Sequence, residues 1–155
     1  MATLSKYCFE KDLELSKKYE RKFGEWLRKL GIPNVSYAPD GLFEDYDVKT
    51  FDLTYEIKYD RWMATTGNFC LETYSCKENN SLGWFFKTKA DFIVVFYNET
   101  EFVGISRKDL QDAWFDHPEI WKQVKIQQEW GTTICWLADC KKIPGIKMGS
   151  ITDVN

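Results

Sequence analysis

The N-terminal segment carries a long stripe of mostly apolar side chains at the spacing of an α-helix. Alternating steps of four and three residues place seven side chains on one helical face: Phe9, Leu13, Ser16, Glu20, Phe23, Leu27 and Leu30. Gly31 and Pro33 then end the pattern, as a left-handed cap and a helix breaker do. We therefore expect one helix from about Ser5 to Leu30, lying across one face of the domain.

Glu20 stands in the middle of that stripe, where an apolar side chain is expected. A carboxylate at such a position must be paired, point into a polar cleft, or reach solvent past the edge of the stripe. Tyr19 and Trp26 widen the apolar face, so Glu20 could still reach solvent past its edge. The spacing alone leaves these alternatives open.

The pattern changes to strands and turns after Asn34. Residues 45–48 read as a short strand and Lys49 and Thr50 as a turn, after which residues 52–60 alternate without a break. We expect further strands at residues 69–74, 92–97, 101–105 and 132–137. The run at 92–97 is apolar throughout, which implies a buried central strand, whereas 132–137 reads as an edge strand.

Helical signals return in the last third of the chain. Ser106 and Asp109 form a capping box for a short helix through Trp114, and Pro118 opens another helical turn. Residues 75–82 are polar and rich in turn formers, so we expect a loop there.

The whole is one α/β domain over residues 1–155, with a central mixed sheet of four or five strands and the long N-terminal helix across one face. Shorter helices are expected at the periphery from Ser106 to about Lys125.

The alternating strand carries the residues that point to chemistry. Glu56 and Lys58 are two positions apart and therefore share one face of the strand. If Asp47 lies on the partner strand of a hairpin, its carboxylate reaches the same place. Asp47, Glu56 and the backbone carbonyl of Ile57 are the hard oxygen ligands that Mg²⁺ prefers, and Lys58 would neutralise charge beside a water bound to the metal.

Taken alone, this pattern also fits an antiparallel strand with one solvent-exposed face, on which Glu and Lys are common. Three further features favour a catalytic site over an ordinary solvent-exposed strand. Glu20 lies on the inward stripe of the leading helix, and Glu72 lies on the strand that follows Lys58. Lys87 and Lys89 precede the buried strand, where a pattern that faces the core does not require them.

The order of these elements resembles the PD-(D/E)xK, or restriction-endonuclease-like, nuclease superfamily, which includes Holliday-junction resolvases and small phage-encoded nucleases. The likeness spans roughly residues 20–97, and it is closest to small phage and mobile-element proteins. Five short segments carry it: Glu56-Ile57-Lys58-Tyr59-Asp60, Thr66-Gly67-Asn68, Glu72, Ser81-Leu82-Gly83 and Thr88-Lys89-Ala90-Asp91. The resemblance implies a restriction-endonuclease-like core and Mg²⁺-dependent hydrolysis of DNA, with Mn²⁺ able to substitute.

By this resemblance Asp47 and Glu56 would be metal ligands and Lys58 the catalytic lysine. Glu20 would contact a metal or its waters, and Glu72 matches an acidic position of the phage-type pattern whose role the resemblance does not define. Tyr46 stands where the family has a proline before the aspartate, which leaves Asp45 or Asp47 as the ligand. We favour Asp47, because its spacing to Glu56 suits a tight hairpin.

Lys87, Lys89 and the loop at 75–82 are where we expect contacts to the phosphate backbone of DNA. A solvated loop is the alternative for both lysines.

The net charge of −3 and the pI of about 5.3 give no global basic field for a polyanion. Aromatic residues make up 17% of the chain. We expect most of them in the core, although some could stack on bases as in single-strand binders.

Residues 1–10 lack the features of a signal peptide, and no stretch approaches the roughly 18 apolar residues that cross a bilayer. The five cysteines are an odd number, which favours reduced thiols and a cytoplasmic location, in the host cytoplasm if the protein is phage-encoded. The spacings from Cys70 to Cys76 and from Cys135 to Cys140 are not those of a zinc knuckle, so structural zinc is not expected.

Two other functions fit the same residues. The chain could be a nucleic-acid-binding module that keeps the fold but has no turnover. It could instead be a phage accessory protein that binds a host protein through exposed Trp62, Trp121 or Trp130. A homodimer would suit cleavage of a two-fold DNA junction, but no residue in the sequence identifies its interface.

Overall fold

The computed structural model of the protein describes residues 5–39 and 45–152, with side chains described from residue 14 onward within those ranges. The side chains of Phe9 and Leu13, two members of the expected stripe, lie outside the described residues. The fold is α/β. The elements follow one another as α1 (Ser5–Lys29), β1 (Ser36–Tyr37), β2 (Val48–Lys49), β3 (Thr54–Tyr59), α2 (Met63–Thr66), β4 (Asn68–Cys76), β5 (Ser81–Leu82), α3 (Trp84–Lys87), β6 (Phe92–Phe96), β7 (Glu101–Ser106), α4 (Arg107–Asp116), η2 (Pro118–Ile120), β8 (Lys122–Gln128), β9 (Gly131–Asp139), η3 (Cys140–Lys142) and β10 (Lys147–Ser150).

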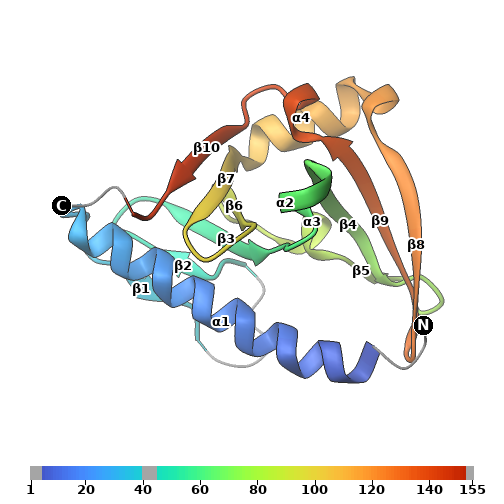
Figure 1. The fold of residues 1–155 in the computed structure, drawn as a ribbon, viewed down its shortest axis with the longest axis horizontal. Helices are drawn as coiled ribbons and strands as arrows, with labels where there is room; N and C mark the ends of the chain where they lie inside the picture. Colours follow the sequence, from blue (N-terminus) through green and yellow to red (C-terminus); the bar gives the residue numbers. More distant parts are fainter. Residues whose placement is uncertain (1–4, 40–44, 153–155) are drawn as a thin grey trace.

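The strands form two sheets. The first has six strands in the order β1-β2-β3-β6-β7-β10, and it is mixed because β3 and β6 are parallel while the other neighbours are antiparallel. The second has four antiparallel strands in the order β5-β4-β9-β8. In Figure 1, α1 runs along the first sheet, and the second sheet lies toward the other side of the molecule. The connection from β3 to its parallel neighbour β6 passes through α2, β4, β5 and α3.

Strand β6 is apolar throughout because both of its faces are covered. Val94 and Phe96 face a core formed with α1, in which Tyr19 and Phe23 are buried. Ile93 faces the opposite way, into a core closed by the second sheet and α4. This confirms the buried central strand expected from the sequence, and it confirms the long helix that covers one sheet face.

The Ser106 N-cap, one half of the expected capping box, is confirmed. The Ser106 hydroxyl accepts a hydrogen bond from the backbone N–H of Asp109 at 3.0 Å, and α4 continues two residues beyond Trp114, to Asp116. The hairpin before β3 is present but shifted. Its first strand begins at Val48 rather than at residue 45, and its turn lies after Lys49, with the Thr50 N–H bonded to the Leu53 carbonyl at 2.8 Å.

The second sheet is the main correction to the expected architecture. Residues 122–128 form strand β8 instead of belonging to a peripheral helix, and β9 lies between β4 and β8 instead of at an edge. The first sheet has six strands rather than four or five. The sequence did not predict β8 because this strand is largely exposed and carries few apolar side chains, so its residues show little hydrophobic periodicity. It is held in place by its ladder of hydrogen bonds to β9.

Candidate active site

The hairpin of β2 and β3 places Asp47 beside the Glu-x-Lys strand. Val48 pairs with Tyr55, and the Asp47 N–H donates to the Tyr55 carbonyl at 2.8 Å. The Asp47 side chain then turns toward β3, where its Oδ2 accepts the backbone N–H of Ile57 at 2.7 Å. The Ile57 side chain points the other way, into the core beneath α1. Asp47 and the backbone next to Glu56 therefore meet at one point.

Glu56 and Lys58 share a face of β3 and form an ion pair. The Lys58 Nζ lies 3.0 Å from Glu56 Oε2, and the Glu56 side chain is only 8% exposed while that of Lys58 is 34% exposed. The Lys58 ammonium also lies over the Trp84 ring, 5.7 Å from its centroid. Trp84 had no assigned role in the sequence, because nothing in its local pattern predicts a contact with a strand 26 positions earlier.

Glu72 reaches this group from the second sheet. It lies on β4, and its Oε1 accepts the backbone N–H of Trp84 at 3.3 Å in the first turn of α3. Burial raises the pKa of the Glu72 carboxyl, and the charges of Lys58 and Lys87 oppose that rise. Glu72 and Lys87 therefore both lie within electrostatic reach of the site.

Glu20 reaches the same group from α1. Burial raises the pKa of the Glu20 carboxyl, the charge of Lys58 lowers it, and the charge of Glu56 raises it. Glu20 is half-buried, and its charged neighbours also include Lys17 and Arg21, so it does not stand freely exposed at the edge of the stripe. The adjacent Tyr19 ring anchors this part of α1 by stacking on Tyr59 of β3, with centroids 4.5 Å apart.

Asp47 and Glu56 repel one another within the cluster. Burial and the neighbouring Glu56 raise the pKa of Asp47 to about 8, although Lys58 and the Ile57 N–H oppose the rise. Burial by itself lowers the pKa of Lys58, but the carboxylates of Glu56, Asp47 and Glu72 outweigh it, so the net shift is upward. Lys58 is shared among Glu56, Asp47 and Glu72, so a further cation beside Asp47 and Glu56 would relieve the repulsion between those two carboxylates.

Asp47 and Glu56 are oxygen donors of the kind that bind a hard divalent ion. Among the described side chains, those of residues 14–39 and 45–152, no three His, Cys, Asp or Glu come together closely enough to hold an ion by themselves. Mg²⁺ is commonly bound by one or two carboxylates with waters and substrate oxygens. Asp47 and Glu56 can supply that pair, whereas a site formed entirely by protein side chains would need more ligands.

Lys87, Lys89 and Asp45 lie at the rim of the cluster. Lys89 is 75% exposed and its Nζ lies 3.8 Å from Asp45, whose carbonyl also accepts the Lys89 N–H at 3.0 Å. Asp45 therefore faces the α3–β6 connection, and Asp47 is the acid that contacts β3. This arrangement favours Asp47 over Asp45 as a ligand.

The three tryptophans suggested as anchors for a partner differ in exposure. Trp62 is 63% exposed and Trp130 is 44% exposed. Trp121 is buried, and its indole N–H donates to the Ala113 carbonyl at 3.1 Å. The expectation of an exposed Trp121 is wrong because η2 turns this residue under α4 after Pro118.

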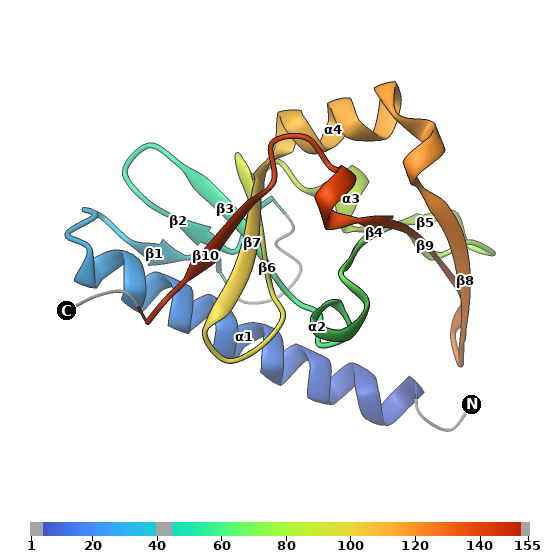
Figure 2. The same ribbon diagram turned by 45° about the horizontal axis from the view of Figure 1, so that its top comes forward.

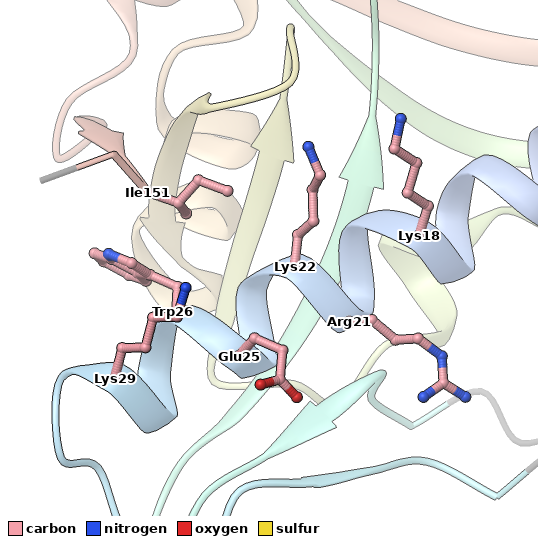
Figure 3. A pocket seen from close by; sticks show the side chains of 7 residues that line it. All are labelled: Lys18, Arg21, Lys22, Glu25, Trp26, Lys29 and Ile151. Carbon is pink, nitrogen blue, oxygen red and sulfur yellow. The ribbon is translucent and has the colours of Figure 1, made fainter. Parts of the chain in front are cut away.

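A shallow pocket of about 380 Å³ lies over α1, away from the acidic cluster. Figure 3 shows Lys18 and Lys22 pointing to one side of the helix, while Arg21 and Glu25 point to the other. Both lysines are paired with Glu99. The pocket contains none of the residues that meet around Lys58, so we place the candidate chemistry at the β2–β3 hairpin.

Gly83 lets α3 approach β4 closely enough to hold Glu72 in place. A Cβ at Gly83 would lie 2.5 Å from the Glu72 carbonyl oxygen, which is backbone and has little freedom to move. We expect Gly83→Ala to lower the free energy of unfolding by about 1 to 3 kcal/mol. Urea unfolding should show this loss, whereas Gly104→Ala on β7, where the nearest atom lies 3.9 Å away, should change stability little. Equal stability of the two variants would contradict this account of α3 packing.

No family model matches the sequence, and neither a curated protein nor a solved structure matches the chain. Among the described residues, no helix combines the length and the apolar character that crossing a membrane requires.

Proposed function

We propose that this chain is a metal-dependent deoxyribonuclease of the PD-(D/E)xK class, built on a restriction-endonuclease-like core. The observation that carries the proposal is the meeting of Asp47 with the Glu56–Lys58 pair across the β2–β3 hairpin. The long helix packed on a mixed sheet is compatible with such a core. Glu20 and Glu72, which the sequence resemblance had also assigned to the site, lie within electrostatic reach of Lys58.

Each residue has a role that follows from its surroundings. Asp47 and Glu56 would hold the ion, and bound Mg²⁺ would supply the Lewis acid and the activated water that phosphodiester hydrolysis requires. Lys58 places a fixed positive charge where negative charge develops on the phosphate in the transition state. Glu20 and Glu72 retain a proton to higher pH than ordinary glutamates, because burial raises their pKa values. Glu20 would contact the metal or its waters, as the resemblance implies, and Glu72 would stand beside the site as a further acid.

Cleavage of defined DNA substrates tests the proposal. Purified protein would be incubated with supercoiled, linear and four-way-junction DNA in Mg²⁺, Mn²⁺ or EDTA, beside Glu56→Gln. We expect cleavage of at least one substrate with either metal, none in EDTA, and a loss of more than about a hundredfold in Glu56→Gln, because the change removes a metal ligand. If DNA is bound but never cut, the chain is an inactive binding module, and the proposal of catalysis is wrong.

A further inference from the structure

A second hollow, of about 290 Å³, lies between α3 and α4, two elements that Figure 2 shows next to one another. It includes the two lysines for which the sequence predicted phosphate contacts. Its lining residues are Phe85, Phe86, Lys87, Thr88, Lys89, Arg107, Gln111 and Phe115. We call this hollow the α3–α4 groove.

The groove is basic although the chain as a whole is acidic. Lys87, Lys89 and Arg107 contribute three positive charges, and no Asp or Glu is among the eight lining residues, whereas the whole chain carries a net charge of −3. Two of these cations have acidic neighbours: Lys87 lies within electrostatic reach of Glu72, and Lys89 lies 3.8 Å from Asp45 in an exposed and loosely spaced pair. Such a pair contributes little stability, so a phosphate can compete for Lys89. The charge of the groove therefore complements a polyanion.

Aromatic rings stand exposed at the same place. Arg107, Gln111 and Phe115 follow at steps of four, so they share one face of α4. Phe115 is 71% exposed and Phe86 is 44% exposed. The Phe86 ring is braced from behind by the buried Phe85, with centroids 5.3 Å apart. Exposed rings beside cations are the combination by which single-strand binders stack bases and hold phosphates.

The groove adjoins the acidic cluster through short, bonded segments. Helix α3 begins at Trp84, which contacts Lys58 and Glu72, and ends at Lys87 in the groove. A helix of four residues spans only about 6 Å. On the other side, the Thr88 hydroxyl and the Lys89 N–H both donate to the Asp45 carbonyl, two residues before Asp47.

We propose that the α3–α4 groove binds an unpaired nucleic-acid strand and leads it toward Asp47 and Glu56. This inference rests on the proposed function, and it narrows the substrate to DNA with a single-stranded portion, such as a flap, a gap or an open junction. Base pairs would hide the faces of the bases that Phe86 and Phe115 stack on, so a continuous duplex is the poorer ligand.

Binding measured without cleavage tests the groove. Fluorescence anisotropy in EDTA would compare labelled oligothymidylate, oligouridylate and a duplex of equal length. We expect single strands to bind more tightly than the duplex, and Phe115→Ala to weaken single-strand binding about tenfold through lost stacking. The matched control is Phe51→Ala, which removes a ring that is 74% exposed and lies outside the groove, and it should bind as the wild type does.

The salt dependence tests the phosphate contacts separately. Each single-strand phosphate contact contributes about 0.7 to the slope of log affinity against log salt. Lys89→Ala should reduce that slope by about this amount, whereas Lys125→Ala on β8, outside the groove, should leave it unchanged. Tighter binding of oligouridylate than oligothymidylate would identify RNA as the source of the strand and would overturn the narrowing to DNA.

Three results would contradict the proposal that the groove binds a single strand. These are wild-type binding by Phe115→Ala, a preference for duplex, and displacement of the oligonucleotide by a glutamate-rich peptide as readily as by unlabelled oligonucleotide. The last would mean that the groove responds to charge alone. Failure of the proposed function gives a different result. If the wild type never cuts DNA but Phe115→Ala weakens strand binding, the binding groove is supported and only the proposed catalysis is wrong.

Discussion

Lys58→Met is expected to slow DNA cleavage by about a hundred- to a thousandfold, the usual loss when one preorganised charge at the reacting centre is removed. Methionine keeps the approximate length of the side chain but removes the ammonium that lies 3.0 Å from Glu56. Saturating Mg²⁺ should not restore the rate, because the missing charge acts on the transition state rather than on the affinity for the ion.

The same substitution should leave divalent-metal binding unchanged or tighter. Lys58 is the positive charge whose presence opposes the raised pKa values of Asp47 and Glu72. Removing it makes the cluster more negative, and a more negative cluster attracts a cation more strongly. Loss of rate without loss of metal affinity therefore separates a catalytic Lys58 from one that only maintains the fold.

Lys49→Met is the matched control for this experiment. Lys49 is an exposed lysine on the neighbouring strand β2, and its ammonium lies over the Tyr46 ring rather than at the acids. We expect wild-type cleavage and metal binding from it. A Lys58→Met protein that cuts at the wild-type rate would remove Lys58 from the reaction, and one that also fails to bind metal would give it a structural role.

Asp47→Asn is expected to stabilise the metal-free protein, by an amount that grows as the pH rises. The folded protein holds the pKa of Asp47 at about 8, against an ordinary value of 3.8. Between these values the folded state binds more protons than the unfolded state, so the contribution of Asp47 to stability is full at low pH and is lost as the pH rises toward 8. Asparagine has no charge to bury, and its side-chain oxygen can still accept the Ile57 N–H.

Urea unfolding in EDTA would measure this effect at several pH values between about 4 and 8. The difference in unfolding free energy, variant minus wild type, should rise with pH and reach at least about 2 kcal/mol at the alkaline end. Asp52→Asn, at an exposed position of the same hairpin, should leave the pH dependence of the wild type unchanged. Parallel curves for Asp47→Asn and wild type would mean that Asp47 is not buried among like charges.

The hairpin could be predicted from sequence because its signals are local. Alternation fixes that Glu56 and Lys58 share a face, and a short connection forces the preceding segment to pair with β3. The stripe that carries Phe23 and Leu27 likewise predicted the helix and its buried face. Each of these depends on neighbours within about ten positions along the chain.

Other features depend on contacts between distant segments and could not be predicted. The polar strand β8 is ordered only by its pairing with β9, so its own residues contain little evidence of a strand. The contact of Trp84 with Lys58 depends on how α3 packs against β4, which Gly83 permits. The sequence could name Glu20 and Glu72 as misplaced acids, but only the packing of α1 and of the second sheet brings them toward Lys58.

Titration of the protein with Mn²⁺ in a calorimeter at neutral pH tests the central claim most directly. We expect saturable binding to the wild type, retained by Asp45→Asn and weakened more than about a hundredfold by Asp47→Asn or Glu56→Gln. Asp45 is the informative control, because it is the other candidate aspartate and it faces Lys89 instead of β3. A wild-type protein that binds no Mn²⁺, or variants at Asp47 and Glu56 that bind it as the wild type does, would contradict a metal centre at this hairpin.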